Sequence, residues 1–193
     1  MHTAIDTQLD NPEKLDFVRS VLTNLIGKTC WQVKRSYGRV LYFDLGMRVR
    51  SKPIIEREFG EWVIDTRGLS YRVTRFDDDV VLFEHHAWDD SDDQPDDPEY
   101  YQLTGAFMDK IVGSTVTDVQ VNPQTLGLRI VFGNTLIFEI LPTSQDELNI
   151  EEGDEPEDGE FWRVYRSLPP IESISVGAQR RMLYKKEQID TDE

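Results

Sequence analysis

The feature that most constrains this chain is a pair of matching helix signals, 86 residues apart. Asn11-Pro12-Glu13 opens a segment that ends in Leu25-Ile26-Gly27, and Asp97-Pro98-Glu99 opens one that ends in Ile111-Val112-Gly113. Asn or Asp caps a helix start, Pro fits the first helical position, and Gly adopts the left-handed conformation that stops a helix. We therefore predict two amphipathic helices, because apolar residues recur at helical spacing. These residues are Leu15, Val18, Leu22 and Leu25 in the first segment and Tyr100, Leu103, Phe107 and Ile111 in the second.

The likeness between the two segments continues into predicted strands. Residues 41–46 and 128–133 both place alternate apolar side chains on one strand face. A strand containing a Trp follows in each half, at residues 61–64 and 161–164, and Gly133-Asn134 predicts a two-residue hairpin turn. Further strands are predicted at residues 71–76, 80–84, 136–140 and 171–176.

The predicted fold class is α+β and β-rich, with two tandem helix-plus-antiparallel-strand repeats. An approximate twofold axis is expected to relate the repeats, which pack as one globular unit. The predicted organisation is a flexible N-terminus at 1–10, a first repeat at 11–88, an acidic linker at 89–97, a second repeat at 98–184 with an acidic loop at 145–160, and a flexible tail at 185–193. A chain of 193 residues is long enough to bury the shared core that this plan requires.

The net charge of −16 is concentrated in two stretches of the chain. Residues 77–99 contain eleven Asp and Glu, residues 139–160 contain ten, and neither stretch contains Lys or Arg. Because nucleic-acid backbones repel such segments, we expect no direct nucleic-acid binding. A basic protein partner would be attracted to them.

Several features indicate a cytoplasmic protein. Cys30 is the only cysteine, so the chain cannot form an internal disulfide. No run approaches the roughly 18 apolar residues that span a bilayer, so no membrane association is expected. The N-terminus also lacks the basic start and apolar middle of a signal peptide.

The residues that could carry chemistry have simpler interpretations. Adjacent His85 and His86, near Asp89 and Asp90, could bind a metal, but neighbouring strand residues point to opposite faces. Cys30 could be a nucleophile, but it occupies an apolar position of the repeat and is expected to be buried. No phosphate-binding Gly-rich loop or nucleophile elbow is present. We therefore predict a non-enzymatic protein with no catalytic residues, no metal and no cofactor.

A family resemblance supports this prediction. It is carried by Leu25-Ile26-Gly27-Lys28, residues 37–46, Gly60-Glu61-Trp62, Tyr71-Arg72-Val73, residues 119–132 and Phe161-Trp162-Arg163-Val164. In these motifs the chain resembles a bacterial family of uncharacterised small acidic proteins, which are similar to the immunity proteins that accompany bacterial toxins. The resemblance implies a protein that neutralises a toxin by binding it. The long acidic loop before Trp162 departs from the family pattern.

The leading functional hypothesis is a non-catalytic, immunity-type inhibitor that binds a basic partner, such as a toxin or nuclease, through its acidic loops. The predicted partner-binding residues are Trp88, Asp89, Asp90, Asp92, Asp93, Asp96, Asp97, Glu151, Glu152, Asp154, Glu155, Glu157 and Asp158. A DNA mimic that blocks a nucleic-acid-binding protein is a variant of this hypothesis. The alternatives are a small-ligand-binding protein or enzyme with a pocket between the repeats, and a structural subunit of a larger assembly.

Overall fold

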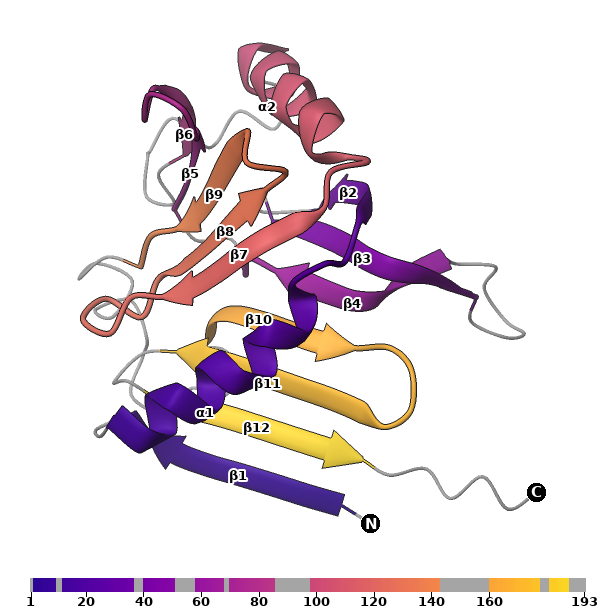
Figure 1. Ribbon diagram of the computed structural model, residues 1–193, viewed down its shortest axis with the longest axis vertical. Coiled ribbons are helices and arrows are strands. Elements are labelled where there is room, and N and C mark those ends of the chain that lie inside the picture. Colours follow the sequence, from indigo (N-terminus) through magenta and orange to yellow (C-terminus); the bar gives the residue numbers. More distant parts are fainter. Residues whose placement is uncertain are drawn as a thin grey trace.

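The computed structural model describes residues 2–9, 12–36, 40–50, 58–67, 70–85, 98–142, 160–177 and 181–187. These residues form two antiparallel sheets and two short α-helices (Figure 1). The elements are β1 (His2–Gln8), α1 (Pro12–Leu22), a 3-10 turn η1 (Thr23–Leu25), β2 (Cys30–Arg35), β3 (Leu41–Arg50), β4 (Glu58–Asp65), β5 (Tyr71–Arg75), β6 (Val81–His85), α2 (Pro98–Ile111), β7 (Val116–Val121), β8 (Leu128–Phe132), β9 (Leu136–Ile140), β10 (Glu160–Arg166), β11 (Ile171–Gly177) and β12 (Arg181–Glu187). The predicted β-rich, α+β class is confirmed. Among the described helices, none is long and apolar enough to cross a membrane.

Each half of the chain supplies strands to both sheets. The seven-stranded sheet has the order β1-β12-β11-β10-β4-β3-β2, and the five-stranded sheet has the order β6-β5-β9-β8-β7. β4 from the first half pairs with β10 from the second, and β5 pairs with β9 in the same crossed manner. The two halves are therefore interleaved, and neither sheet is complete without strands from both.

The two sheets face each other across an aromatic core. Phe43 of β3 packs against Phe132 and Phe138 of the opposite sheet, with ring centroids 5.9 and 4.6 Å apart. Trp162 of β10 is fully buried, and its indole Nε1 donates a hydrogen bond of 2.8 Å to the carbonyl oxygen of Leu126. Burial of these large rings between the sheets supplies much of the hydrophobic stabilisation.

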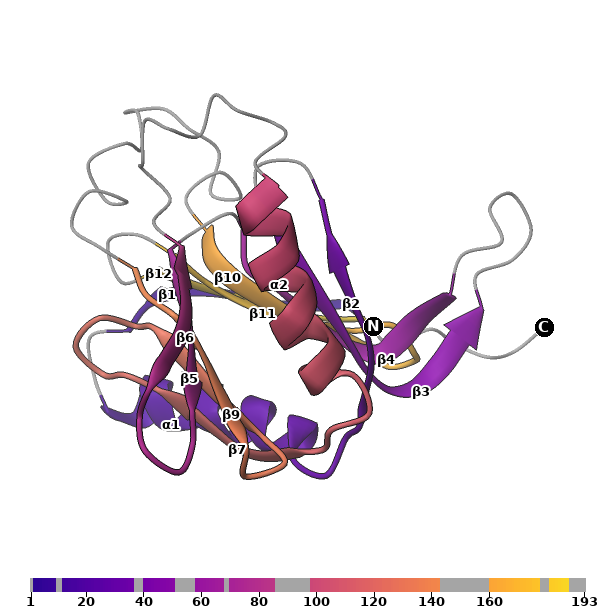
Figure 2. The ribbon, with the colours of Figure 1, turned by 90° about the horizontal axis from the view of Figure 1, so that it is seen from above.

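Each helix covers a side of the sandwich, in contact with both sheets. α1 packs beside β7, and its Phe17 meets Tyr184 of β12 edge to face at 4.9 Å. α2 lies between β6 and β2 (Figure 2), and its Phe107 packs on Phe83 of β6 at 5.5 Å. The apolar stripe of each helix therefore packs against strands of both sheets.

The two predicted helix-ending glycines join the halves of the chain. Gly27 and Gly113 have φ angles of +82° and +88°, a conformation that glycine adopts without steric strain. The Gly27 N–H donates to the carbonyl oxygen of Val116 (2.8 Å), and the Gly113 N–H donates to that of Cys30 (2.7 Å). The end of each helical segment is thus hydrogen-bonded to the strand that follows the other helix.

The structure alters two details of the prediction. In α2 the buried stripe uses Thr104, fully buried, where Leu103 was expected, and Leu103 is 42% exposed. The shift places inward residues at 100, 104, 107 and 111, which keeps helical spacing. Gly133 and Asn134 do form a turn with positive φ angles, but three residues separate the paired Phe132 and Leu136.

The chain ends also differ from the prediction of flexible residues at 1–10 and 185–193. Residues 2–8 form β1, an edge strand paired in register with β12, which extends to Glu187. The sequence HTAIDTQ has little apolar content to indicate a strand. Its stabilisation comes from backbone hydrogen bonds to β12, a partner that lies at the other end of the sequence.

Candidate functional site

The predicted partner-binding residues all lie outside the described residues. They fall in segments 86–97 and 143–159, which together contain 14 Asp and Glu and no Lys or Arg. The described residues contain 17 Lys and Arg and 18 Asp and Glu. The folded scaffold is therefore close to neutral, and nearly all of the net charge belongs to the remaining residues.

The described residues that flank these two segments meet at one end of the five-stranded sheet. His85 and Ile140, the last residues of β6 and β9, are the cross-strand partners of Tyr71 on its two sides. Tyr100, in the first turn of α2, shares a hydrogen bond of 2.9 Å between its hydroxyl and that of Tyr71. The described residues on both sides of segment 86–97 therefore lie beside Tyr71, as does Ile140, shortly before segment 143–159.

Strand β10, which follows segment 143–159 in the chain, begins close to the same residues. Trp162, two residues into β10, is hydrogen-bonded to Leu126. Gly127, the residue after Leu126, packs so closely on Ile140 that an added Cβ would lie 2.6 Å from the Ile140 carbonyl oxygen. We call this region, defined by Tyr71, His85, Tyr100, Ile140 and Trp162, the acidic end of the sandwich.

His85 is a core residue of the acidic end. Its side chain is only 4% exposed, and its ring lies 5.1 Å from that of Tyr71 and 6.0 Å from that of Tyr100. His86 lies outside the described residues. No group of three or more His, Cys, Asp or Glu side chains that could hold a metal ion occurs in the described part of the chain.

Cys30 is buried, as the sequence predicted. Burial raises the pKa of its thiol to about 12, and its Sγ donates to the carbonyl oxygen of Gln32. Since the thiolate is the nucleophile of cysteine chemistry, the buried thiol is inert near neutral pH.

The buried carboxylates Glu61 and Asp44 form ion pairs that hold strands together. The Glu61 carboxylate lies 2.8 Å from the Lys28 ammonium and 3.6 Å from the Arg166 guanidinium. The Asp44 carboxylate lies 2.7 Å from the Lys34 ammonium and also accepts a backbone N–H bond of 2.7 Å. Removing one partner would leave a buried charge uncompensated, so these groups have structural roles.

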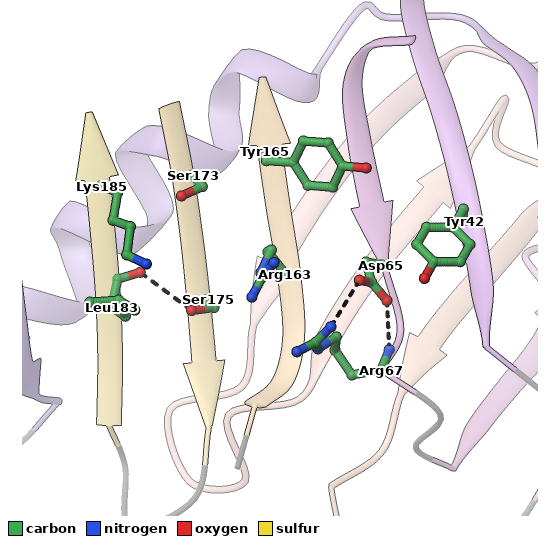
Figure 3. Close-up of a pocket in the computed structure, with 9 residues that line it drawn as sticks. All are labelled: Tyr42, Asp65, Arg67, Arg163, Tyr165, Ser173, Ser175, Leu183 and Lys185. Carbon is green, nitrogen blue, oxygen red and sulfur yellow. Dashed lines mark hydrogen bonds and ion pairs between the residues drawn. The ribbon is translucent and has the colours of Figure 1, made fainter. Parts of the chain in front are cut away.

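A polar pocket of about 440 Å³ opens on the face of the seven-stranded sheet that points away from the core (Figure 3). Asp65 and Arg67, at the end of β4, form one wall. The Asp65 carboxylate accepts the Arg67 backbone N–H (3.0 Å) and lies 3.6 Å from its guanidinium. The other lining residues come from β3, β10, β11 and β12 and are Tyr42, Arg163, Tyr165, Ser173, Ser175, Leu183 and Lys185.

Tyr165 is a stable hydroxyl donor in this pocket. Burial raises the pKa of its phenol to about 12, and the negative charge of Asp65 contributes to the shift. The phenol therefore keeps its proton at neutral pH.

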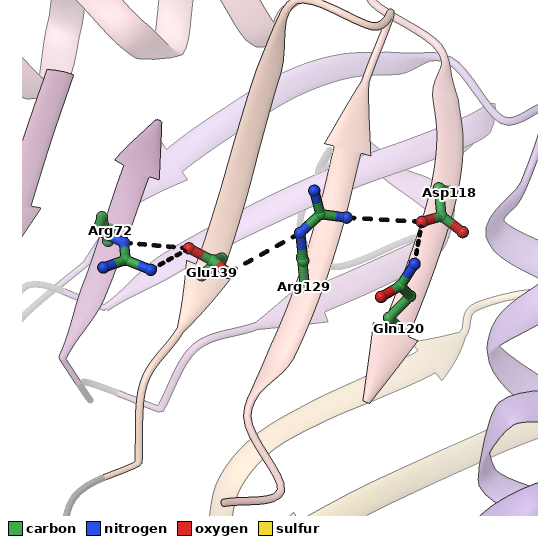
Figure 4. A network of polar contacts seen from close by, with 5 residues as sticks. All are labelled: Arg72, Asp118, Gln120, Arg129 and Glu139. Carbon is green, nitrogen blue, oxygen red and sulfur yellow. Dashed lines mark hydrogen bonds and ion pairs between the residues drawn. The ribbon is translucent and has the colours of Figure 1, made fainter. Parts of the chain in front are cut away.

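The corresponding face of the five-stranded sheet carries a ladder of charges (Figure 4). Glu139 of β9 accepts hydrogen bonds of 2.6 and 3.1 Å from Arg72 of β5 and lies 3.9 Å from the Arg129 Nε of β8. Arg129 in turn lies 3.6 Å from the Asp118 carboxylate, which also accepts a bond from Gln120. Opposite charges on neighbouring strands satisfy one another across this face.

The sequence did not single out the pocket residues. Residues at alternate positions of a strand share one face. In β10 these are Arg163 and Tyr165, and in β12 they are Leu183 and Lys185. That alternation is visible in the sequence, but the neighbour order β12-β11-β10-β4-β3 that assembles the pocket is not.

Comparisons with protein-family models, with curated proteins and with solved structures found no match.

Proposed function

We propose that this chain is a non-catalytic, immunity-type binding protein that captures a basic partner at its acidic end. The observation that carries the proposal is the convergence of the flanks of both acidic segments around Tyr71, through its pairing with His85 and Ile140. The described flanks of segments 86–97 and 143–159, which together contain 14 acidic residues, thus lie at one end of a near-neutral scaffold. Such a local concentration of charge accelerates the encounter with a basic surface.

The proposed anchors are those predicted from the sequence: Trp88 with the aspartates of residues 89–97, and secondarily the acids of residues 151–158. An aromatic residue among acids can supply a desolvated contact at the centre of an interface. The partner is a basic protein such as a toxin or nuclease, whose functional surface the inhibitor would cover.

The test begins with capture of the partner from the native host at low salt, followed by stopped-flow measurement of its association rate. One variant replaces Asp89, Asp90 and Asp92 with Asn. The matched control replaces Asp77, Asp78 and Asp79, three exposed acids in the turn at the opposite end of the β5–β6 hairpin. Both variants lose three negative charges, so only the location of the charge differs.

We expect the first variant to associate about tenfold more slowly at low salt, and the control to change by less than about twofold. The difference should shrink at physiological salt, because the Debye length falls to about 8 Å. Equal rates for the two variants, or a parent rate that does not respond to salt, would contradict binding through the acidic end.

We also propose that the two halves are copies of one unit, related by an approximate twofold axis near Thr29 and Thr115. An isolated antiparallel bridge between these residues, 86 apart, supports the proposal, and their hydroxyl oxygens lie 3.3 Å apart. A glycine at the corresponding position of each half donates a hydrogen bond to one of these threonines. The Gly46 N–H donates to the Thr29 carbonyl oxygen (2.9 Å), and the Gly133 N–H donates to the Thr115 carbonyl oxygen (2.8 Å).

The order of strands supports the same proposal. The series β2-β3-β4-β10-β11 in one sheet matches β7-β8-β9-β5-β6 in the other. A register shift follows the first pair in both β2–β3 and β7–β8, between Cys30 and Gln32 and between Val116 and Asp118. Each unit would therefore donate its last strands to the sheet of the other, as in a domain-swapped dimer joined into one chain.

Co-expression of residues 1–90 and 91–193 as separate chains tests this exchange. We expect the fragments to copurify as a one-to-one complex and neither to give a dispersed NMR spectrum alone, because each sheet needs strands from both. Independent folding of either fragment as a monomer would contradict the exchanged arrangement.

A further inference from the structure

The pocket on the outer face of the seven-stranded sheet has the chemistry of an anion site. Arg67, Arg163 and Lys185 bring three positive charges to it from three separate parts of the chain, and Asp65 is the one acidic residue among the described residues that line it. Tyr165 adds a phenol that stays protonated. We propose that this pocket binds a small organic anion through a carboxylate or phosphate group.

The size of the pocket and the donors that line it suit such a ligand. A volume of about 440 Å³ lies within the usual range for small-molecule sites. Guanidinium groups present planar pairs of N–H donors that match the oxygens of carboxylate and phosphate. The hydroxyls of Tyr42, Tyr165 and Ser173 supply further donors around them.

The backbone at Arg67 is an independent indication of a built site. Arg67 has a φ of +53°, in the left-handed region that non-glycine residues rarely occupy. Asp65 holds this conformation by accepting the Arg67 N–H at 3.0 Å and lies 3.6 Å from its guanidinium. Residues held in such uncommon conformations cluster at ligand sites.

The strand register shows how this face differs from its counterpart on the five-stranded sheet. Arg72 is paired across the strands with Glu139 on one side and Glu84 on the other. Arg163 has Asp65 and Ser175 at the same two positions. The position that Glu84 occupies beside Arg72 is therefore occupied by the hydroxyl of Ser175 beside Arg163.

The experiment is an NMR titration of the full, ¹⁵N-labelled chain at constant ionic strength, maintained with chloride. Inorganic phosphate and citrate are the two probes, so that the phosphate and carboxylate sources are separated. We expect saturable shifts of the Ser173 and Ser175 amides and of the Arg163 side-chain Nε–H with at least one probe, at roughly millimolar Kd.

Two variants and two controls decide whether the pocket is responsible. Arg163→Gln and Lys185→Gln should each weaken binding about tenfold or more, since each removes a charge-assisted hydrogen bond. Arg72→Gln, at the register-equivalent position, and Lys186→Gln, on the other face of β12, should change the Kd by less than about twofold.

Every outcome bears on the proposal. Binding of phosphate alone, citrate alone or both, lost in the pocket variants and retained in the controls, would support it and identify the ligand chemistry. The absence of saturable shifts with both probes would overturn it, as would equal weakening by the controls, which would indicate a general charge effect. Lys185 is exposed, so Lys185→Gln keeps the test valid if Arg163→Gln disturbs the fold.

Discussion

Phe43 offers the sharpest test of the shared core. Its side chain is fully buried, and it packs on Phe132 and Phe138 of the five-stranded sheet while belonging to the seven-stranded one. Phe43→Ala removes a ring that contacts both sheets at once. The cavity would lie between them, so the loss of stability should affect both.

The expected loss of stability has the size usual for the truncation of a buried aromatic side chain. Replacing a buried Phe with Ala lowers the free energy of unfolding by about 3–5 kcal/mol. Since domains are stable by only about 5–15 kcal/mol, this is a large fraction of the total. For a chain of this size the melting temperature should fall by roughly 6–20 °C.

Urea unfolding followed by two probes gives the measurement. Trp fluorescence reports mainly on the seven-stranded sheet, where Trp31, Trp62 and Trp162 lie in β2, β4 and β10. Amide exchange in β8 and β9 reports on the other sheet. Val81→Ala, at a position 49% exposed, is the control and should change stability by less than about 0.5 kcal/mol.

Both probes should shift together in Phe43→Ala, because the cavity lies between the two sheets. A fluorescence transition that moves while exchange in β8 and β9 stays unchanged would show that the sheets unfold independently. A loss of less than about 1 kcal/mol would show that Phe43 does not fill the junction as the contacts indicate.

Three further predictions can be checked by urea denaturation. A Cβ added at Gly60 would lie 2.4 Å from a backbone nitrogen, so Gly60→Ala should destabilise the protein by more than about 3 kcal/mol. Gly105 of α2 has open space around it, so Gly105→Ala should be neutral or stabilising by up to about 1 kcal/mol. Trp162→Phe loses a buried hydrogen bond of 2.8 Å and should lower stability by about 1–3 kcal/mol. Folding raises the pKa of Cys30 from 9.0, and that of Tyr165 from 10.0, to about 12 in each case. The contribution of these two groups to the free energy of unfolding is therefore complete below pH 9 and is lost as the pH rises toward 12. Cys30→Ala should flatten the first part of that decline, and an unchanged pH profile would contradict the assignment to Cys30.

Much of the fold could be predicted from local signals. The caps and glycines around both helices, and the alternation in β3 and β8, arise from interactions within a few residues of the chain. The pairing of β5 with β9 and of β10 with β4 could not be predicted, because the apolar faces of β5 and β10 would fit either sheet. Edge strand β1 was missed for a related reason: its stabilising partner, β12, is nearly a whole chain length away.

The candidate site was predicted only in part. The concentration of charge in two segments is a property of the sequence, but their flanks meet because Tyr71 pairs with both His85 and Ile140. Cross-strand neighbours of this kind depend on topology. The pocket on the seven-stranded sheet depends on topology even more, since its lining comes from strands β3, β4, β10, β11 and β12.

Strand β12 lines the pocket on the seven-stranded sheet, and the described strands of the five-stranded sheet include none at the corresponding place beside the charge ladder. The five-stranded sheet ends at β6, the positional counterpart of β11, and its outer face has Arg72 flanked by carboxylates on both sides. The seven-stranded sheet continues past β11, and β12 brings Leu183 and Lys185 alongside Ser173 and Ser175. β12 thus contributes Lys185 to the polar face, and Ser175 has its hydroxyl at the register position that Glu84 occupies in the other sheet. The opposite charges of the ladder satisfy one another and stabilise the five-stranded sheet, whereas the pocket is lined by Arg67, Arg163, Lys185 and several hydroxyl groups, which are suited to hold an anion.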